Sequence, residues 1–244
     1  MAENLWDEAA AASYDTPGTG MFASEVVDPA VDRLVELSAG GAVLEFAVGT
    51  GRIALPLAER GVAVSGIELS EPMVKQLRSK EGGAAMPIVI GDMATTTVPG
   101  EFSLVYLVFN TITNLLTQDE QVACFENAAR HLLPGGRFVI ENGVPELRKL
   151  PVGGTGVVFG GGDGYLGVDT YDPVAQHLTS HHVRFGAGRD ASLFRSRHRY
   201  VWPSELDLMA RIAGFELESR AADWIGSTFT GDSESHVSVY RLKG

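Results

Sequence analysis

The stretch that decides the fold is VLEFAVGTG, residues 43–51, an apolar run with an acid at its end and glycines at alternate positions. An apolar run of this length before a turn indicates a buried strand, and the residues after Gly51 can continue as a helix. Gly49 and Gly51 leave the turn free of side chains, and the first N–H groups of the helix point toward a ligand there. Because the carboxylate of Glu45 would attract a cation and repel a pyrophosphate, we expect a nucleoside cofactor with positive charge.

Strands and helices are predicted to alternate around this stretch. The predicted helices span 3–12, 23–37, 52–60, 71–79 and 119–133, and the predicted strands span 42–47, 62–68, 86–90, 102–108 and 137–141. Single helices between strands require right-handed crossovers and a parallel sheet that is covered on both faces. With two further strands predicted at 215–220 and 236–242, we expect an α/β fold: a Rossmann-like, seven-stranded, mostly parallel sheet with helices on both faces.

The pattern changes after residue 141. Residues 151–164 are rich in glycine and predict a mobile connection. Three runs with alternating apolar residues, 165–171, 177–185 and 194–202, predict an antiparallel meander with turns at 172–173 and 186–188. A helix at 203–213 and strands at 215–220 and 236–242 complete the chain. We expect an antiparallel β lid inserted after the fifth strand.

This order predicts a single domain over residues 1–244. Its parts are N-terminal helices at 1–40, a cofactor-binding core at 41–142, the lid at 151–202, and the final helix and edge strands at 203–244. A chain of 244 residues is long enough to bury a full core.

The composition restricts the partners. The formal net charge is −12 with only 19 lysines and arginines, which argues against nucleic acid, because a nucleic-acid binder needs a basic face. No apolar run approaches the roughly 20 residues of a membrane span, and the N-terminus lacks the features of a signal peptide. A single cysteine, Cys124, allows no internal disulfide and fits a reducing, cytoplasmic location.

The glycine turn alone leaves two cofactors open. Gly49-x-Gly51-x-x-Ala54 also fits the dinucleotide fingerprint, with Glu68 placed where an acid would hold a ribose, so a nicotinamide-dependent oxidoreductase is the alternative. Three further features separate the two: Glu45 before the glycines, Gly91-Asp92-Met93 after the third strand, and the helix stop LLPGG at 132–136.

Together these motifs resemble the class I S-adenosylmethionine-dependent methyltransferases, over nearly the whole chain. GIELS at 66–70, GDM at 91–93 and LLPGG are especially similar to small-molecule enzymes that N-methylate amino sugars in antibiotic pathways. The resemblance implies S-adenosylmethionine as cofactor, S-adenosylhomocysteine as product, and a small-molecule acceptor of secondary metabolism. Resembling enzymes are often dimers, which makes a homodimer an open expectation.

The resemblance also implies roles for single residues of the core. Glu45 would bind the amino group of the cofactor, Glu68 both ribose hydroxyls, and Asp92 the adenine amino group. The other implied cofactor contacts are Tyr14, Ala47, Gly49, Gly51, Arg52, Leu69, Met73, Met93 and Val108, where Tyr14 and Arg52 would face the carboxylate and Val108 would offer its carbonyl.

Two departures from the family pattern matter. Ala47 stands where the family usually has a glycine, so we expect a slightly displaced turn rather than lost binding. Asn114 stands where some amino-sugar N-methyltransferases place a histidine proposed as base, and an amide cannot take a proton at neutral pH. Asn110 and Asn114 are expected to contact the acceptor instead.

The lid supplies the remaining candidates. His181 and His182 are adjacent, so strand pleating sends them to opposite faces, and no metal site is expected. The apolar character of its face favours His181 as the inward residue, and we expect His181, His198 and Tyr200 to contact the acceptor or act in catalysis. Arg195, Arg197 and Arg199 alternate with these. Turned outward they form a solvated face, and turned inward they would indicate an anionic or nucleotide-linked acceptor.

Methyl transfer is an in-line displacement at an activated carbon, so the protein must supply alignment and a dry cavity. An amine acceptor only has to arrive neutral, whereas a hydroxyl usually needs a base or a metal. No base is obvious in the sequence, which slightly favours nitrogen over oxygen. Besides the oxidoreductase, a non-catalytic S-adenosylmethionine-binding protein remains the alternative.

Overall fold

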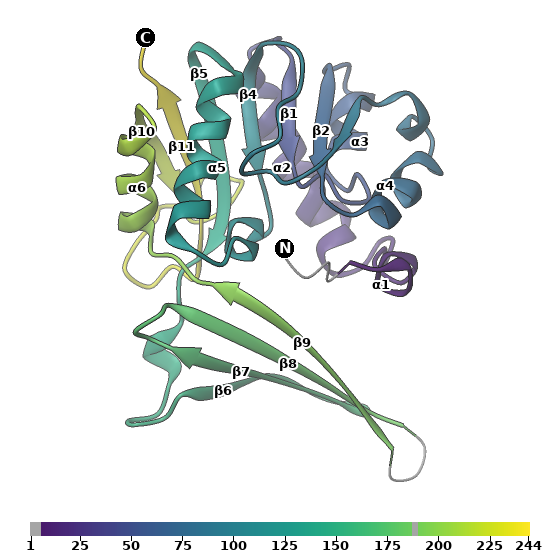
Figure 1. Ribbon diagram of the computed structural model, residues 1–244, viewed down its shortest axis with the longest axis vertical. Helices are drawn as coiled ribbons and strands as arrows, with labels where there is room; N and C mark the ends of the chain where they lie inside the picture. Colours follow the sequence, from purple (N-terminus) through teal and green to yellow (C-terminus); the bar gives the residue numbers. More distant parts are fainter. Residues whose placement is uncertain (1–5, 187–189) are drawn as a thin grey trace.

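The computed structural model describes residues 6–186 and 190–244 and contains two β-sheets (Figure 1). The larger sheet has seven strands in the order β10-β11-β5-β4-β1-β2-β3, of which β1 to β5 pair in parallel and β10 and β11 antiparallel. The strands are β1 (Val43–Phe46), β2 (Val64–Glu68), β3 (Ile88–Ile90), β4 (Phe102–Leu107), β5 (Leu132–Gly143), β10 (Phe215–Ala221) and β11 (Ser235–Leu242). This order confirms the predicted seven-stranded, mostly parallel sheet.

Helices cover both faces of this sheet. Leu34 of α2 (Ser24–Ser38), Leu57 of α3 (Ala54–Glu59) and Leu77 of α4 (Glu71–Arg78) share one core with strand residues such as Tyr106. On the other face, α5 (Gln118–His131) and α6 (Pro203–Ile212) pack against Phe46, Phe138 and Tyr240. The free thiol of Cys124 lies in this second core and is buried, as a packing residue would be.

Short helices complete the large layer. They are α1 (Glu8–Ala12) and the 3₁₀ turns η1 (Gly20–Phe22), η2 (Gly83–Ala85), η3 (Thr111–Asn114) and η4 (Leu147–Lys149). The helix α5 ends at His131, two residues before its predicted end at 133, and the LLPGG segment forms the start of β5, with Gly135 at a positive φ of 77°. Within the described residues, no helix combines the length and apolar character that a membrane crossing requires.

The smaller sheet is antiparallel and has four strands, β6 (Gly156–Gly162), β7 (Tyr165–Asp172), β8 (His177–Phe185) and β9 (Ala191–Arg199). The expected mobile connection at 151–164 is therefore wrong in part, since half of it is strand β6. Glycine has a low strand propensity, which hides the strand in the sequence. The turn predicted at 186–188 falls largely outside the described residues.

The smaller sheet lies next to the edge of the larger sheet at which the parallel strands end. The chain leaves β5 at its carboxyl end and enters β6, so the parallel strands point toward the small sheet, which we call the lid (Figure 1). Ligands of open parallel sheets bind at the carboxyl ends of the strands. This edge, between the strand ends, the lid and α1, is where a site is expected.

Candidate active site

A cavity of about 140 Å³ lies at the carboxyl ends of β1, β2 and β4. Many of the predicted site residues line it, namely Tyr14, Ala47, Gly49, Glu68, Leu69, Met73, Asp92, Met93 and Asn114. Trp6, Gly91, Thr111 and Leu115 line it as well and were not predicted. A larger groove of about 680 Å³ lies between α2, β10 and β11, away from the glycine turn, and holds none of the predicted residues.

The turn after β1 forms the floor of the cavity. Ala47 has a φ of 53° and Gly49 a φ of 58°, so this turn runs through the left-handed region, which an alanine adopts only under strain. Gly51 does not line the cavity. A Cβ there would come within 2.9 Å of Leu55, so this glycine allows the turn to pack on α3 rather than to touch a ligand.

Glu68 ends β2 with its carboxylate in the cavity wall. One oxygen accepts a hydrogen bond from the N–H of Gly49 and the other from the N–H of Ser70, both at 2.8 Å. Burial raises the pKa of Glu68, and these backbone bonds act against that rise. The carboxylate is therefore fixed in place, and each oxygen keeps a lone pair for a hydroxyl of a ligand.

Glu45 lies beneath the cavity rather than in its wall. Its carboxyl is buried and accepts a hydrogen bond of 2.6 Å from the hydroxyl of Tyr106, which β4 brings alongside. Burial raises the pKa of Glu45 to about 8. A buried acid with this pKa is neutral at pH 7 and becomes charged when a cation approaches, which suits a positively charged ligand.

The loop after β3 forms the wall on the β2 side. Asp92 lines the cavity and accepts a hydrogen bond of 2.8 Å from the N–H of Ala94, which fixes its carboxylate. Met93 is buried beside it, and Leu69 and Met73 line the cavity from the turn after β2 and the start of α4. An acid among apolar side chains fits a flat heterocycle that carries an amino group.

The N-terminal segment closes the cavity from outside. The ring of Trp6 packs edge-on to that of Tyr14 at 5.2 Å, and the hydroxyl of Ser70 donates to the carbonyl of Trp6 at 2.6 Å. Asp15 accepts a hydrogen bond from Thr50 at 2.6 Å and forms an ion pair with Lys80 at 2.5 Å. These contacts hold Tyr14 over the cavity.

Arg52 was predicted to contact the cofactor, but it does not line the cavity. Its guanidinium donates to the carbonyl of Met21 at 3.1 Å and lies 5.2 Å from the ring centre of Phe109. The arginine is thus occupied in holding the N-terminal segment against the turn after β4. Its charge still acts on Tyr14 and Glu45, on which it lowers the pKa against the larger effect of burial.

The turn after β4 separates the two predicted asparagines. Asn114 of η3 lines the cavity, whereas the side chain of Asn110 is exposed and accepts a hydrogen bond from the N–H of Gly143 at the end of β5. The predicted role of Asn110 in acceptor binding therefore has no geometric support. The carbonyl of Val108 accepts hydrogen bonds from the N–H and the hydroxyl of Thr111, so a ligand would have to compete for it.

The lid reverses the prediction for its adjacent histidines. His181 pairs with Arg195 across β8 and β9 and is hydrogen-bonded to Thr170 and Arg195, on the face that carries the exposed arginines. His182 lies on the opposite face with Phe194, which is also the face of His198. The prediction that His181 faces inward is wrong, because strand pairing and not the apolar count of each face decides the orientation.

His198 connects the lid to the cavity wall. Its Nδ1 lies 3.3 Å from the hydroxyl of Thr113 in η3, and its Nε2 lies 3.0 Å from the hydroxyl of Ser196. Burial lowers the pKa of His198, so the imidazole is neutral near pH 7. Tyr200 is buried, with its ring 5.9 Å from that of Tyr171, and burial raises the pKa of Tyr200.

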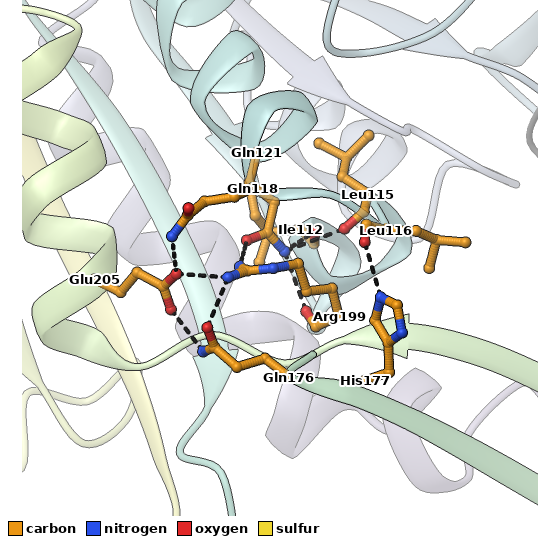
Figure 2. Close-up of polar contacts among 9 residues, drawn as sticks. All are labelled: Ile112, Leu115, Leu116, Gln118, Gln121, Gln176, His177, Arg199 and Glu205. Carbon is orange, nitrogen blue, oxygen red and sulfur yellow. Dashed lines mark hydrogen bonds and ion pairs between the residues drawn. The ribbon is translucent and has the colours of Figure 1, made fainter. Parts of the chain in front are cut away.

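The arginine row splits between two environments. Arg195 and Arg197 are exposed on the outer face of the lid. Arg199 is buried where the lid meets the core and donates hydrogen bonds to Gln121, Gln176 and Glu205 (Figure 2). None of the three supplies a positive charge to the inner face of the lid.

Comparison with known proteins places this geometry in a family. Residues 43–136 match the family described as "Methyltransferase domain". The solved structure of the CcbJ methyltransferase from Streptomyces caelestis is 40% identical, covers 88% of this chain and 89% of its own, and superposes with a TM-score of 0.80. The chain belongs to the S-adenosylmethionine-dependent methyltransferases.

Two further relatives extend the comparison. A curated relative over 97% of both chains is the cypemycin N-terminal methyltransferase of a Streptomyces species, at 28% identity. CalS10 of Micromonospora echinaspora, an amino pentose methyltransferase solved with S-adenosylmethionine bound, shares the fold over 100% of both chains at 20% identity and a TM-score of 0.72. The nicotinamide alternative finds no support among these methyltransferases.

The residues of this methyltransferase fit its cofactor. A fixed carboxylate at the end of β2, an acid beside apolar side chains after β3, and a buried acid under the glycine turn match a ribose, an adenine and a cationic amino acid. Trp6, Tyr106 and His182 were not found by sequence reasoning. Tyr106 reaches Glu45 only through the pairing of β4 with β1, for which no local motif exists.

Proposed function

We propose that this methyltransferase N-methylates a small-molecule acceptor of natural-product metabolism, with residues 41–142 binding the cofactor and residues 151–202 contacting the acceptor. The preference for nitrogen rests on the environment of the three residues that were predicted as candidate bases. His198 has hydrogen-bond partners on both ring nitrogens, His181 lies on the outer face, and Tyr200 is buried with a raised pKa. An amine acceptor needs none of them as a base, whereas a hydroxyl would.

The relatives support the same preference. The cypemycin enzyme and CalS10 are both named for transfer to molecules that carry amino groups, an N-terminus and an amino pentose. These names describe those proteins. For this chain they make an amine the first acceptor to test.

The mechanism follows from what the chain positions. S-adenosylmethionine supplies a methyl group on a positively charged sulfur. Glu45, Glu68 and Asp92 would hold the cofactor at its ammonium, ribose and adenine, and Tyr14 and the N-terminal segment would close the cavity against water. Asn114 and the lid would orient the acceptor so that its nitrogen lone pair faces the methyl group, the alignment that a displacement requires. The methylated amine would lose its extra proton to solvent.

The cofactor assignment is tested by Glu68→Ala and calorimetry. The variant should lose measurable binding of S-adenosylhomocysteine, because the ribose loses its acceptor and the N–H groups of Gly49 and Ser70 lose theirs. Glu81→Ala, at an exposed acid after α4, is the matched control and should bind like the wild-type chain. Unchanged affinity in Glu68→Ala would contradict the assignment.

The acceptor assignment is tested with deuterated S-adenosylmethionine and pairs of compounds that differ only in an amine or a hydroxyl. Mass spectrometry should find the labelled methyl group on nitrogen. Transfer to the hydroxyl member of a pair would overturn the preference for nitrogen. Tight cofactor binding without formation of S-adenosylhomocysteine in any pair would favour the non-catalytic alternative.

A further inference from the structure

The face of the lid that carries His198 combines a row of polar groups with aromatic rings. Strand register places one set of side chains on this side, and we call it the inner lid face: Tyr165, Asp169, Tyr171, Leu178, Ser180, His182, Arg184, Phe194, Ser196 and His198. Its contact with η3 through His198 and Thr113 makes it continuous with the cavity wall, since Thr111 and Asn114 of the same turn line the cavity.

A row of polar groups crosses this face from β7 to the cavity. The hydroxyl of Ser180 donates to Asp169 at 2.7 Å, and Ser180 stands opposite Ser196 on the next strand. Ser196 lies 3.0 Å from His198, which in turn contacts Thr113. Three strands thus present one carboxylate and two hydroxyls side by side, a set that can bind several hydroxyl groups of one molecule.

Aromatic rings border this row on both sides. The imidazole of His182 packs against Tyr165, whose hydroxyl lies 2.8 Å from Nδ1, and against Phe194. On the other side the rings of Tyr171 and Tyr200 pack together. Rings beside a polar row suit a ligand that has both C–H faces and hydroxyl groups.

The charge of the face is negative at its centre. Asp169 is its one carboxylate among the described residues, and Arg184, the one arginine there, lies toward the far end of the strands, 5.8 Å from the ring centre of Tyr165. Asp169 is half-buried, and burial raises its pKa, whereas the hydrogen bond from Ser180 and the charges of His182 and His181 act against that rise. Arg195 and Arg197 face away. A phosphate placed on this row would meet a carboxylate and no arginine, which costs binding energy.

We propose that the inner lid face binds a basic polyhydroxylated acceptor that carries no phosphate, an inference that rests on the proposed function. Asp169 determines this specificity. The Asp169–Ser180–Ser196 row binds hydroxyl groups, and the carboxylate attracts the protonated form of the amine and repels phosphorylated or nucleotide-linked forms. The amine loses its proton to solvent before the methyl transfer.

The test compares one amino sugar in two forms. 3-Amino-3-deoxyglucose and its thymidine diphosphate conjugate are titrated into the full chain loaded with S-adenosylhomocysteine. The free sugar should bind at least about tenfold more tightly, which corresponds to about 1.4 kcal/mol. Equal or tighter binding of the conjugate would overturn the proposal, and so would failure of both forms to bind at millimolar concentrations.

Asp169→Asn keeps the shape and removes the charge. It should weaken binding of the free sugar at least about tenfold and reduce the discrimination against the conjugate, while the affinity for S-adenosylhomocysteine stays unchanged and reports the fold. Ser180→Ala, which removes the donor to Asp169, should weaken the free sugar less. Arg197→Gln on the outer face is the matched control and should change neither affinity. If Asp169→Asn binds both forms like the wild type, Asp169 has no part in specificity.

The results of this binding test can be distinguished from the results that test the proposed function. Methyl transfer to any amine with intact binding of S-adenosylhomocysteine supports the N-methyltransferase even if the conjugate is preferred. Loss of cofactor binding in the wild-type chain would instead remove the proposed function itself.

Discussion

At the scale of single residues, the most consequential group is the carboxyl of Glu45. It is buried, its partner is the Tyr106 hydroxyl, and its pKa is raised to about 8 by burial. The ammonium of a bound cofactor would stabilise the charged form, so binding below pH 8 must release a proton. Affinity should therefore increase with pH, by up to about tenfold per unit, until the pH reaches about 8.

Calorimetry at pH 7 in two buffers with different ionisation enthalpies measures this proton directly. The wild-type chain should release close to one proton as S-adenosylhomocysteine binds. Glu45→Gln keeps the hydrogen bond from Tyr106 and cannot ionise, so its binding enthalpy should lose that buffer dependence. A wild-type enthalpy that is the same in both buffers would show that Glu45 is already charged.

Ala47 gives a second prediction at this scale. Its φ of 53° is costly for alanine and free for glycine, so Ala47→Gly should stabilise the chain by about 1 kcal/mol and raise Tm by about 2–4 °C. Ala58→Gly, inside helix α3, is the opposite control and should destabilise by about 1 kcal/mol. Thermal unfolding of both variants measures the difference. A drop in Tm for Ala47→Gly would mean that the methyl group contributes packing that outweighs the strain.

Sequence reasoning succeeded at the residues that a local motif specifies. Glu68, Asp92 and Gly49 line the cavity, because each lies at or just after the end of a strand, whereas Gly51 of the same glycine turn does not line it. It failed where the role depends on a distant strand. Asn110 is bonded to Gly143 and Arg52 to Met21, and neither contact leaves a trace in the local sequence.

At the scale of elements, the lid shows that the alternation of polar and apolar residues cannot decide which face of a strand points inward. Both faces of β8 carry polar and apolar residues, so the apolar count placed His181 inward, whereas its pairing with Arg195 places it outward. Strand β6 was missed because four of its seven residues are glycine. Its place in the sheet comes from backbone pairing with β7 and from the ring of Phe159, which lies so close to Gly167 that a Cβ there would come within 2.5 Å.

Arg199 stabilises the lid root, the place where the lid meets the core. Figure 2 shows this side chain between Gln121 of α5, Glu205 of α6 and Gln176 before β8, with Gln118 also bound to Glu205. Arg199→Met would leave the Glu205 carboxylate without its cation in a largely buried place, so we expect a loss of about 3–5 kcal/mol in urea unfolding.

Two controls separate the buried charge from the loss of side-chain volume. Arg137→Met breaks the more exposed Arg137–Glu218 pair and should cost less than about 1 kcal/mol. Adding Glu205→Met to Arg199→Met removes the unpaired carboxylate and should recover part of the loss. If Arg199→Met and Arg137→Met cost the same, the buried contacts at the lid root add nothing.

At the scale of the whole molecule, the N-terminal segment and the lid, which are far apart in the sequence, both meet the sheet at the cavity. Thr50 is bonded to Asp15, and Thr113 contacts His198, so the cavity is enclosed by contacts between residues far apart in sequence. The parallel sheet with helices on both faces could be predicted from the alternation of strands and helices. The enclosure could not, since it depends on how separately predicted elements pack.

Two buried groups should give the stability of the cofactor-free chain opposite dependences on pH. His236 is buried and its pKa is lowered from 6.5 to about 4, mainly by burial, so the unfolded chain takes up a proton as the pH falls through 6.5 while the folded chain does not. That term reduces stability as the pH falls from 6.5 to 4. Glu45 has a folded pKa raised from 4.5 to about 8, so the folded chain keeps a proton that the unfolded chain has lost. That term reduces stability as the pH rises from 4.5 to 8.

These two terms cancel between pH 4.5 and 6.5, and above pH 6.5 the Glu45 term continues while the His236 term does not. Stability of the wild-type chain in urea should therefore fall by about 2 kcal/mol from pH 6.5 to 8. Glu45→Gln should remove this fall, and saturating S-adenosylhomocysteine should remove it as well, because the bound ammonium ionises Glu45 at lower pH. His236→Gln should instead uncover the Glu45 term below pH 6.5, so that its stability declines from pH 4.5 upward. Parallel pH profiles for His236→Gln and the wild type would show that His236 takes up its proton equally in both states.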